Sequence, residues 1–151
     1  MHRTTITALA ATGLTALATA LAITTTGSAQ APVPPTTLHL VSKDKKTVGF
    51  FPRHDPRQGD RLGFGAAVTG DDTGSELLIC TIIGSHTALC TVQENLADGT
   101  ITAQGVITNG KVHHTPFAVT GGTGRYDGAH GTALATDRTP ATTDIDITLR
   151  P

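Results

Sequence analysis

Aromatic side chains are scarce in this chain, and their scarcity argues against one class of function. The 151 residues include no Trp, a single Tyr (Tyr126) and four Phe. Carbohydrate-binding modules usually present flat aromatic platforms, because an exposed ring offers a large apolar face to a sugar. The composition therefore argues against a lectin-like role.

A clustered basic surface is also missing. Lys and Arg together number 11, Asp and Glu number 12, and the formal net charge at pH 7 is −1. Nucleic-acid binding needs a basic face, so we expect no nucleic-acid partner. The sequence also lacks an amphipathic helix for a membrane surface, and it contains no Ser-His-Asp arrangement, P-loop or nucleotide fingerprint.

The long apolar segment of the chain lies at its N-terminus. His2 and Arg3 precede an apolar stretch over residues 6–23, and small residues follow up to Ala29. This order is typical of a secretory signal peptide cleaved after Ala29, with a retained membrane anchor as the alternative. We therefore expect a signal peptide over 1–29, a proline-rich linker over 30–36, and one secreted, extracellular domain over 37–151 without membrane contact after cleavage.

Beyond the linker, Thr, Val, Ile and Gly dominate, and no 3.6-residue apolar period is sustained. Short runs of β-forming residues between turn residues predict a sandwich or an up-and-down antiparallel barrel. The turn signals are residues 71–74, 84–86, 98–99 and 109–110. The predicted strands are 37–42, 46–51, 62–69, 76–83, 87–94, 100–108, 113–119, 129–136 and 144–149.

The two cysteines fit the predicted hairpin around residues 84–86. Cys80 and Cys90 each lie five residues from Ser85, so a symmetric hairpin places them opposite each other on adjacent strands. In a secreted chain, two cysteines in that register predict a disulfide. Reduced thiols in the core and a redox or nucleophilic pair are the alternatives.

The most specific motif of the chain runs from Gly121 to Gly131. It reads Gly-Gly-Thr-Gly-Arg-Tyr-Asp-Gly-Ala-His-Gly, and paired glycines between two strands mark a tight corner. It resembles the Gly-Gly-Thr-Gly-x-[Phe/Tyr]-x-x-Ala-x-Gly signature of dirigent proteins and of the related allene oxide cyclase barrels. Three further segments, residues 59–64, 71–74 and 90–105, are similar to other parts of that family.

The resemblance implies an all-β fold, an eight-stranded antiparallel up-and-down β-barrel of the calycin-like kind. Plant members are usually trimeric, so the resemblance is compatible with a homo-oligomer, either a dimer or a trimer. It implies a lumen that binds a hydrophobic small molecule and steers its cyclisation or stereoselective coupling, without cofactor or metal. Such an enzyme would be a cyclase-type isomerase, and the alternative is a non-catalytic extracellular binding or structural barrel.

Glu94, His113 and His114 are the candidate catalytic residues. Alternation along the strand over 87–94 puts Glu94 on the same face as Cys90, where it either points into the lumen as an acid or lies solvated beside the next turn. His113 and His114 are adjacent and face opposite sides, so one of them would serve the lumen as an acid or base. For the same reason the two cannot share a metal ion, and no metal site is predicted.

Four further residues are candidate substrate-binding groups. Gln104 either offers hydrogen bonds to the lumen or bonds the neighbouring backbone. Arg125 would reach an anionic substrate, pair with Asp127 or simply be exposed. Tyr126 occupies the aromatic position of the family motif, where packing against the glycine corner is the default. Asp72 lies in a turn and would project toward one mouth of the barrel, although turn formation alone also explains it.

Overall fold

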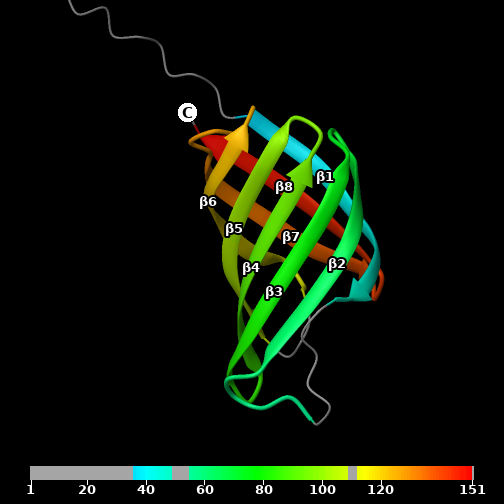
Figure 1. Cartoon of the computed structure of the whole chain (residues 1–151), viewed down its shortest axis with the longest axis vertical. Coiled ribbons are helices and arrows are strands. Elements are labelled where there is room, and N and C mark those ends of the chain that lie inside the picture. Colours follow the sequence, from blue (N-terminus) through cyan, green and yellow to red (C-terminus); the bar gives the residue numbers. More distant parts are fainter. Residues whose placement is uncertain (1–35, 49–54, 109–111, 151) are drawn as a thin grey trace, which may run out of the picture. The chain divides into compact units, whose positions relative to one another are not determined.

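The computed structural model describes residues 36–48, 55–108 and 112–150, which form a β-barrel (Figure 1). The runs rich in Val, Ile, Leu and Thr form strands because their side chains alternate between a buried and an outer face. Among the described residues there is no helix long and apolar enough to cross a membrane. The strands are β1 (Thr36–Thr47), β2 (Arg61–Gly70), β3 (Gly74–Gly84), β4 (Thr87–Leu96), β5 (Gly99–Thr108), β6 (Thr115–Gly124), β7 (His130–Thr139) and β8 (Thr142–Arg150).

Each strand pairs antiparallel with the next, and the first pairs with the last. The β1–β8 ladder, with Leu40 opposite Ile145, closes the sheet. Closure leaves no unpaired sheet edge that could pair with another chain. The predicted fold class, an eight-stranded antiparallel up-and-down barrel, is therefore confirmed.

The nine predicted strands become eight because two of them belong to one strand. The runs 37–42 and 46–51 meet within β1, where the register against β2 shifts between Lys43 and Lys46. Asp44 takes a positive φ of 56° at this bulge, and the extra residue changes which face each later side chain occupies. Residues 49–51 of the second run, the predicted turn at 109–110 and the predicted signal peptide lie outside the described residues.

Two other predicted turns, at residues 71–74 and 84–86, connect neighbouring strands as expected. At the third, the turn residues are 97–98, and Gly99 already begins β5. Gly99 has a φ of 150°, and a Cβ there would lie 2.1 Å from the carbonyl oxygen of Thr123. Only glycine fits this close approach of two backbones.

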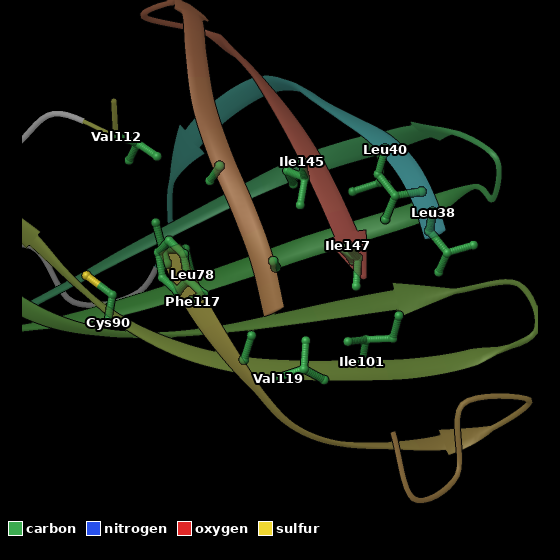
Figure 2. Close-up of a cluster of buried hydrophobic side chains, with 14 of the residues drawn as sticks. Leu38, Leu40, Leu78, Cys90, Ile101, Val112, Phe117, Val119, Ile145 and Ile147 are labelled. Carbon is green, nitrogen blue, oxygen red and sulfur yellow. The ribbon is translucent and has the colours of Figure 1, made fainter. Parts of the chain in front are cut away.

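The core fills the inside of the barrel with aliphatic side chains. Leu40, Ile101 and Ile147 are almost completely buried and point inward from separate strands (Figure 2). The predicted disulfide is present: Cys80 and Cys90 are directly opposite on β3 and β4, with their Cα atoms 4.0 Å apart. Both cysteines are buried, so the bridge fastens one hairpin from the inside.

The two ends of the barrel are built differently. The closed end carries the β2–β3 and β4–β5 turns and the glycine-rich corner between β6 and β7. The open end carries the β3–β4 and β7–β8 turns, together with residues 112–114 ahead of β6. The candidate site belongs to the open end, whereas the sequence motif belongs to the closed end.

Candidate functional site

A large cavity, the mouth cavity, opens at the open end and measures about 980 Å³. Its polar groups include Lys45, His86, His113, Asp137 and Arg138. Apolar walls with a few polar groups are typical of small-molecule sites, which measure on the order of 300–1,000 Å³. Its apolar walls come from several strands and include Leu62, Phe64, Leu78, Ile82, Ile107 and Val112.

A second, much smaller cavity of about 40 Å³, the deep cavity, lies farther inside the barrel. It shares Lys45, Leu78 and Val112 with the mouth cavity, so the two adjoin. Its walls are otherwise aliphatic and aromatic side chains of the core, with Glu76, Glu94 and Thr143 as its other polar groups. The space inside the barrel therefore narrows from the wide mouth cavity to the small deep cavity, which is lined by two acidic side chains.

Glu76 and Glu94 face each other across β3 and β4. Glu94 is 2% exposed, and neither of its carboxylate oxygens has a hydrogen-bond partner among the described residues. Burial raises the pKa of Glu94 well above its usual range, and the neighbouring Glu76 raises it further. Of the two environments that alternation left open for Glu94, the structure shows the one inside the barrel.

Burial also raises the pKa of Glu76, although the positive charge of Lys45 and the Ser42 hydroxyl act in the opposite direction. Two carboxyl groups placed side by side in an apolar surrounding tend to share a proton instead of both ionising. The pair can therefore offer a hydrogen-bond donor and an anionic acceptor to a ligand at the same place.

Lys45 stands at the junction of the two cavities. Its Nζ lies 2.9 Å from Asp137 Oδ1, and the same carboxylate accepts hydrogen bonds from the Thr143 hydroxyl and the Val112 amide. Before the bulge, the inward-facing residues of β1 have even numbers. The extra residue at the bulge shifts this alternation, so that the odd-numbered Lys45 points into the barrel. The network ties the mouth segment at Val112 to β1, β7 and β8.

The two adjacent histidines occupy the rim of the open end. His113 lines the mouth cavity and is exposed. His114 is also exposed, with a positive φ of 51° and its Nδ1 3.3 Å from the Thr136 hydroxyl. Of the predicted catalytic residues, Glu94 thus lines the deep cavity and His113 the mouth cavity, and His114 lines neither.

Gln104 does not reach the lumen. On β5 the buried side chains are Ile101, Ala103 and Ile107, and Gln104 is exposed on the opposite, outer face. Strand alternation fixes this placement, because a one-residue shift would turn the whole apolar set outward. The lumen contact predicted for Gln104 is therefore not made.

The other three predicted substrate-binding residues gather at the closed end, away from both cavities. The Tyr126 hydroxyl donates a 2.9 Å hydrogen bond to Asp72, and Arg125 pairs with Asp98, not with Asp127. Burial and the hydrogen bond to Asp72 raise the pKa of Tyr126 to about 12. Asp72 thus lines neither the mouth cavity nor the deep cavity, and these contacts close this end of the barrel.

Sequence reasoning missed Glu76, Lys45 and Asp137. The signal for Glu76 was present, because Glu76 and Glu94 each lie four residues from their cysteine in the same hairpin. Among the described residues, no group of three or more His, Cys, Asp or Glu side chains is arranged to hold a metal ion.

A closed antiparallel barrel with an apolar mouth and acidic inner groups is the class of protein that these observations define. The family described as "Allene oxide cyclase barrel like domain" matches residues 67–149, and the chain belongs to this family. No curated protein matches the sequence.

Two solved structures share the fold. A pyocyanin demethylase superposes with a TM-score of 0.57 at 21% identity, over 76% of this chain and 98% of that one. A pterocarpan synthase dirigent protein superposes with a TM-score of 0.59 at 18% identity, over 80% of this chain and 97% of that one. At such identities the likeness establishes the fold alone.

Proposed function

We propose that this barrel binds a hydrophobic small molecule end-first through its open end and steers the cyclisation or coupling of that molecule. The observation that carries the proposal is the continuous narrowing from a mouth cavity of about 980 Å³ to a deep cavity of about 40 Å³ beside Glu94. A ligand of moderate size would bury its apolar body in the mouth and present one end to the acidic groups.

Confinement is the physical basis of the steering. A flexible molecule held in one conformer reacts along one face, because the entropy of reaching that conformer is lost on binding and not during the reaction. Glu94 would supply a proton or stabilise developing charge, since burial raises its pKa above the usual range of a carboxyl group. In this proposal the protein is a cyclase-type isomerase.

Binding is tested with N-phenyl-1-naphthylamine, a neutral dye whose emission rises in apolar sites. Ala88 lines the mouth cavity, so Ala88→Trp should weaken dye binding at least tenfold by filling the space. The matched control is Ala118→Trp on the exposed outer face of β6, which should leave binding unchanged. Dye binding that is absent, or equal in the two variants, would overturn the proposed cavity.

Steering is tested by product analysis. A hydrophobic epoxide or phenoxy radical that closes or couples spontaneously should give one stereoisomer in excess when the protein is added, and Glu94→Gln should reduce that excess. Racemic product with the intact protein, despite demonstrated binding, would reject catalysis and retain binding.

A non-catalytic binding or structural barrel is the second candidate, and one observation favours it. The deep cavity holds only about 40 Å³, because the core around it is filled by side chains such as Phe117, Ile101 and Ile147. Only a small group at one end of a substrate would then fit beside Glu94. The product analysis above separates the two candidates.

We also propose that the protein is secreted. The buried Cys80–Cys90 disulfide supports this, because such bridges persist in oxidising compartments. The predicted cleavage after Ala29 is tested by the N-terminal sequence of the exported protein, which should begin at Gln30.

A second copy of this chain is the partner we propose for the outer face of β3, β4 and β5. From Ser75 to Thr108 the outward positions of these strands carry no charged side chain, and they expose Leu77, Ile83, Leu89 and Val106. An uncharged face can meet its own copy without charge repulsion. Light scattering should show a dimer or trimer that Leu89→Lys dissociates, and a monomeric wild-type protein would reject the assembly.

A further inference from the structure

The deep cavity is lined by an acidic side chain, Glu94, that has no hydrogen-bond partner among the described residues. Both carboxylate oxygens of Glu94 are buried and make no hydrogen bond to the described residues. A buried polar group without a partner is destabilising, and a buried carboxyl group especially so. Because this one borders a cavity, a ligand can supply the missing partner.

The cations near the cavities already have acidic partners. Lys45 is paired with Asp137, and Arg138 is paired with Asp144. Glu94 therefore faces only another carboxyl group, Glu76, among the charged groups that influence it. An anionic ligand end would be repelled by Glu94, whereas a cationic end would find a carboxyl group that is paired with no cation among the described residues.

The size of the deep cavity limits the chemistry of that cationic end. A buried water needs roughly 10–15 Å³ measured in this way, so about 40 Å³ accommodates a group of one to three heavy atoms. An ammonium group with its first carbon fits, but a trimethylammonium group or a charged ring does not. The apolar remainder of the ligand has the mouth cavity of about 980 Å³.

Resting on the proposed function, we propose that the ligand is a hydrophobic primary amine whose ammonium group enters the deep cavity and donates hydrogen bonds to Glu94. Its apolar body lies in the mouth cavity against Phe64, Leu78 and Ile82. Hydrogen bonds between a cation and a carboxylate are roughly twice as strong as neutral ones, and the dry walls strengthen them further.

This recognition depends on pH in a defined direction. The ammonium group needs a carboxylate, and burial raises the pKa of Glu94, so amine binding weakens as the pH falls through the titration of the Glu76–Glu94 pair. The other charged or titratable groups facing the cavities are Lys45 on β1, Asp137 and Arg138 on β7, and His86 and His113 at the rim. The Glu94 variant separates the effect of the Glu76–Glu94 pair on amine binding from the effect of these other groups.

The experiment compares three water-soluble probes of one shape by isothermal titration calorimetry at pH 8: 4-phenylbutylamine, 4-phenylbutanol and 4-phenylbutanoate. The wild-type protein should bind the amine at least tenfold more tightly than the alcohol and should not bind the carboxylate measurably. A trimethylated analogue of the amine should bind at least tenfold more weakly than the amine. Glu94→Gln, which keeps the side-chain size, should remove the preference for amine over alcohol.

The outcomes separate this inference from the proposed function. Equal binding of amine and alcohol by the wild-type protein, or an amine preference that survives in Glu94→Gln, would overturn the amine and keep the hydrophobic site. Binding of none of the probes would overturn both. Because a buried substitution can perturb folding, Glu76→Gln provides a second variant: it leaves Glu94 in place and should retain most of the amine preference.

Discussion

The two ends of this barrel differ in their contacts. The closed end carries the most specific sequence motif, whereas the open end carries the cavities and their acidic side chains. At the closed end, Asp72 bonds Tyr126 and Arg125 pairs with Asp98, so these polar side chains are occupied by other parts of the protein. At the open end, a cavity leads to Glu94, which has no partner among the described residues. A motif can thus identify a fold while the residues available for a ligand lie at the other end.

The glycine corner should show the largest effect of any change that tests this contrast. A Cβ at Gly122 would lie 2.3 Å from the Tyr126 carbonyl oxygen and 2.6 Å from that of Thr100. Since backbone must move, we expect Gly122→Ala to destabilise the barrel by about 3 kcal/mol or more. Chemical denaturation measures this.

The neighbouring glycine provides the matched control. At Gly121 a Cβ would meet only the Thr102 hydroxyl, at 3.5 Å, which is ordinary contact. Gly121→Ala should therefore change the stability little. Equal losses in the two variants would show that the corner is sensitive to any side chain and not to the close backbone approach.

The disulfide should show the next largest effect. Cys80 and Cys90 are separated by 10 residues, and closing a loop of that length stabilises a fold by about 2–3 kcal/mol in the chain-entropy account. The double substitution to Ala should lower the free energy of unfolding by that amount. A double variant as stable as the wild-type protein would mean that β3 and β4 are held by strand pairing alone.

Removal of the Glu94 carboxyl group should raise the free energy of unfolding, whereas the two changes above lower it. We expect Glu94→Leu to stabilise the barrel by about 1–3 kcal/mol at pH 7, because it deletes a buried polar group that has no partner among the described residues. It should also abolish ligand discrimination. A variant less stable than the wild-type protein at pH 7 would contradict the account of Glu94.

The sign of this gain depends on pH. The pKa of Glu94 is raised in the folded state, so the folded protein holds the proton to higher pH than the unfolded chain does. The stability of the wild-type protein therefore falls as the pH rises from about 4.3, the ordinary pKa of Glu, through the folded pKa. The advantage of Glu94→Leu should accordingly shrink toward pH 4, as denaturation at several pH values would show.

The smallest effect is expected at the Tyr126–Asp72 hydrogen bond of the closed end. Tyr126→Phe keeps the ring that packs into the core and removes only the 2.9 Å hydrogen bond, so the loss should be about 1 kcal/mol. Binding of 4-phenylbutylamine should be unchanged. Weaker amine binding by this variant would place the closed end in contact with the ligand.

Much of the fold could be predicted from the sequence, because strand alternation, turn residues and the glycine motif agree. The β1 bulge could not, since the chain around Asp44 looks like a break between two strands, and only the pairing with β2 on both sides of the bulge shows that it is continuous. That bulge also turns Lys45 inward, which a regular alternation would not give.

The site was only partly predictable, because it also depends on strand pairing and barrel closure. The spacing to Cys90 put Glu94 on the face of that cysteine but left a solvated position open, and the same spacing would have put Glu76 on that face. The Lys45–Asp137 pair joins residues 92 positions apart on strands that are not neighbours, so it depends on barrel closure. The sequence shows the polar chemistry of four other candidates, Gln104, Arg125, Tyr126 and Asp72. It does not show the direction of each side chain or the end of the barrel at which it lies, and these decide whether a ligand can contact it.

The most direct test of the central claim is a ¹H–¹⁵N NMR titration of the protein with 4-phenylbutylamine. The account predicts that changes in amide chemical shift concentrate around the open end and the deep cavity, at residues such as Phe64, Val112 and Glu94. The amides of the glycine corner around Tyr126 should not change. Changes centred on the glycine corner, or spread over the outer face of β3–β5, would contradict it.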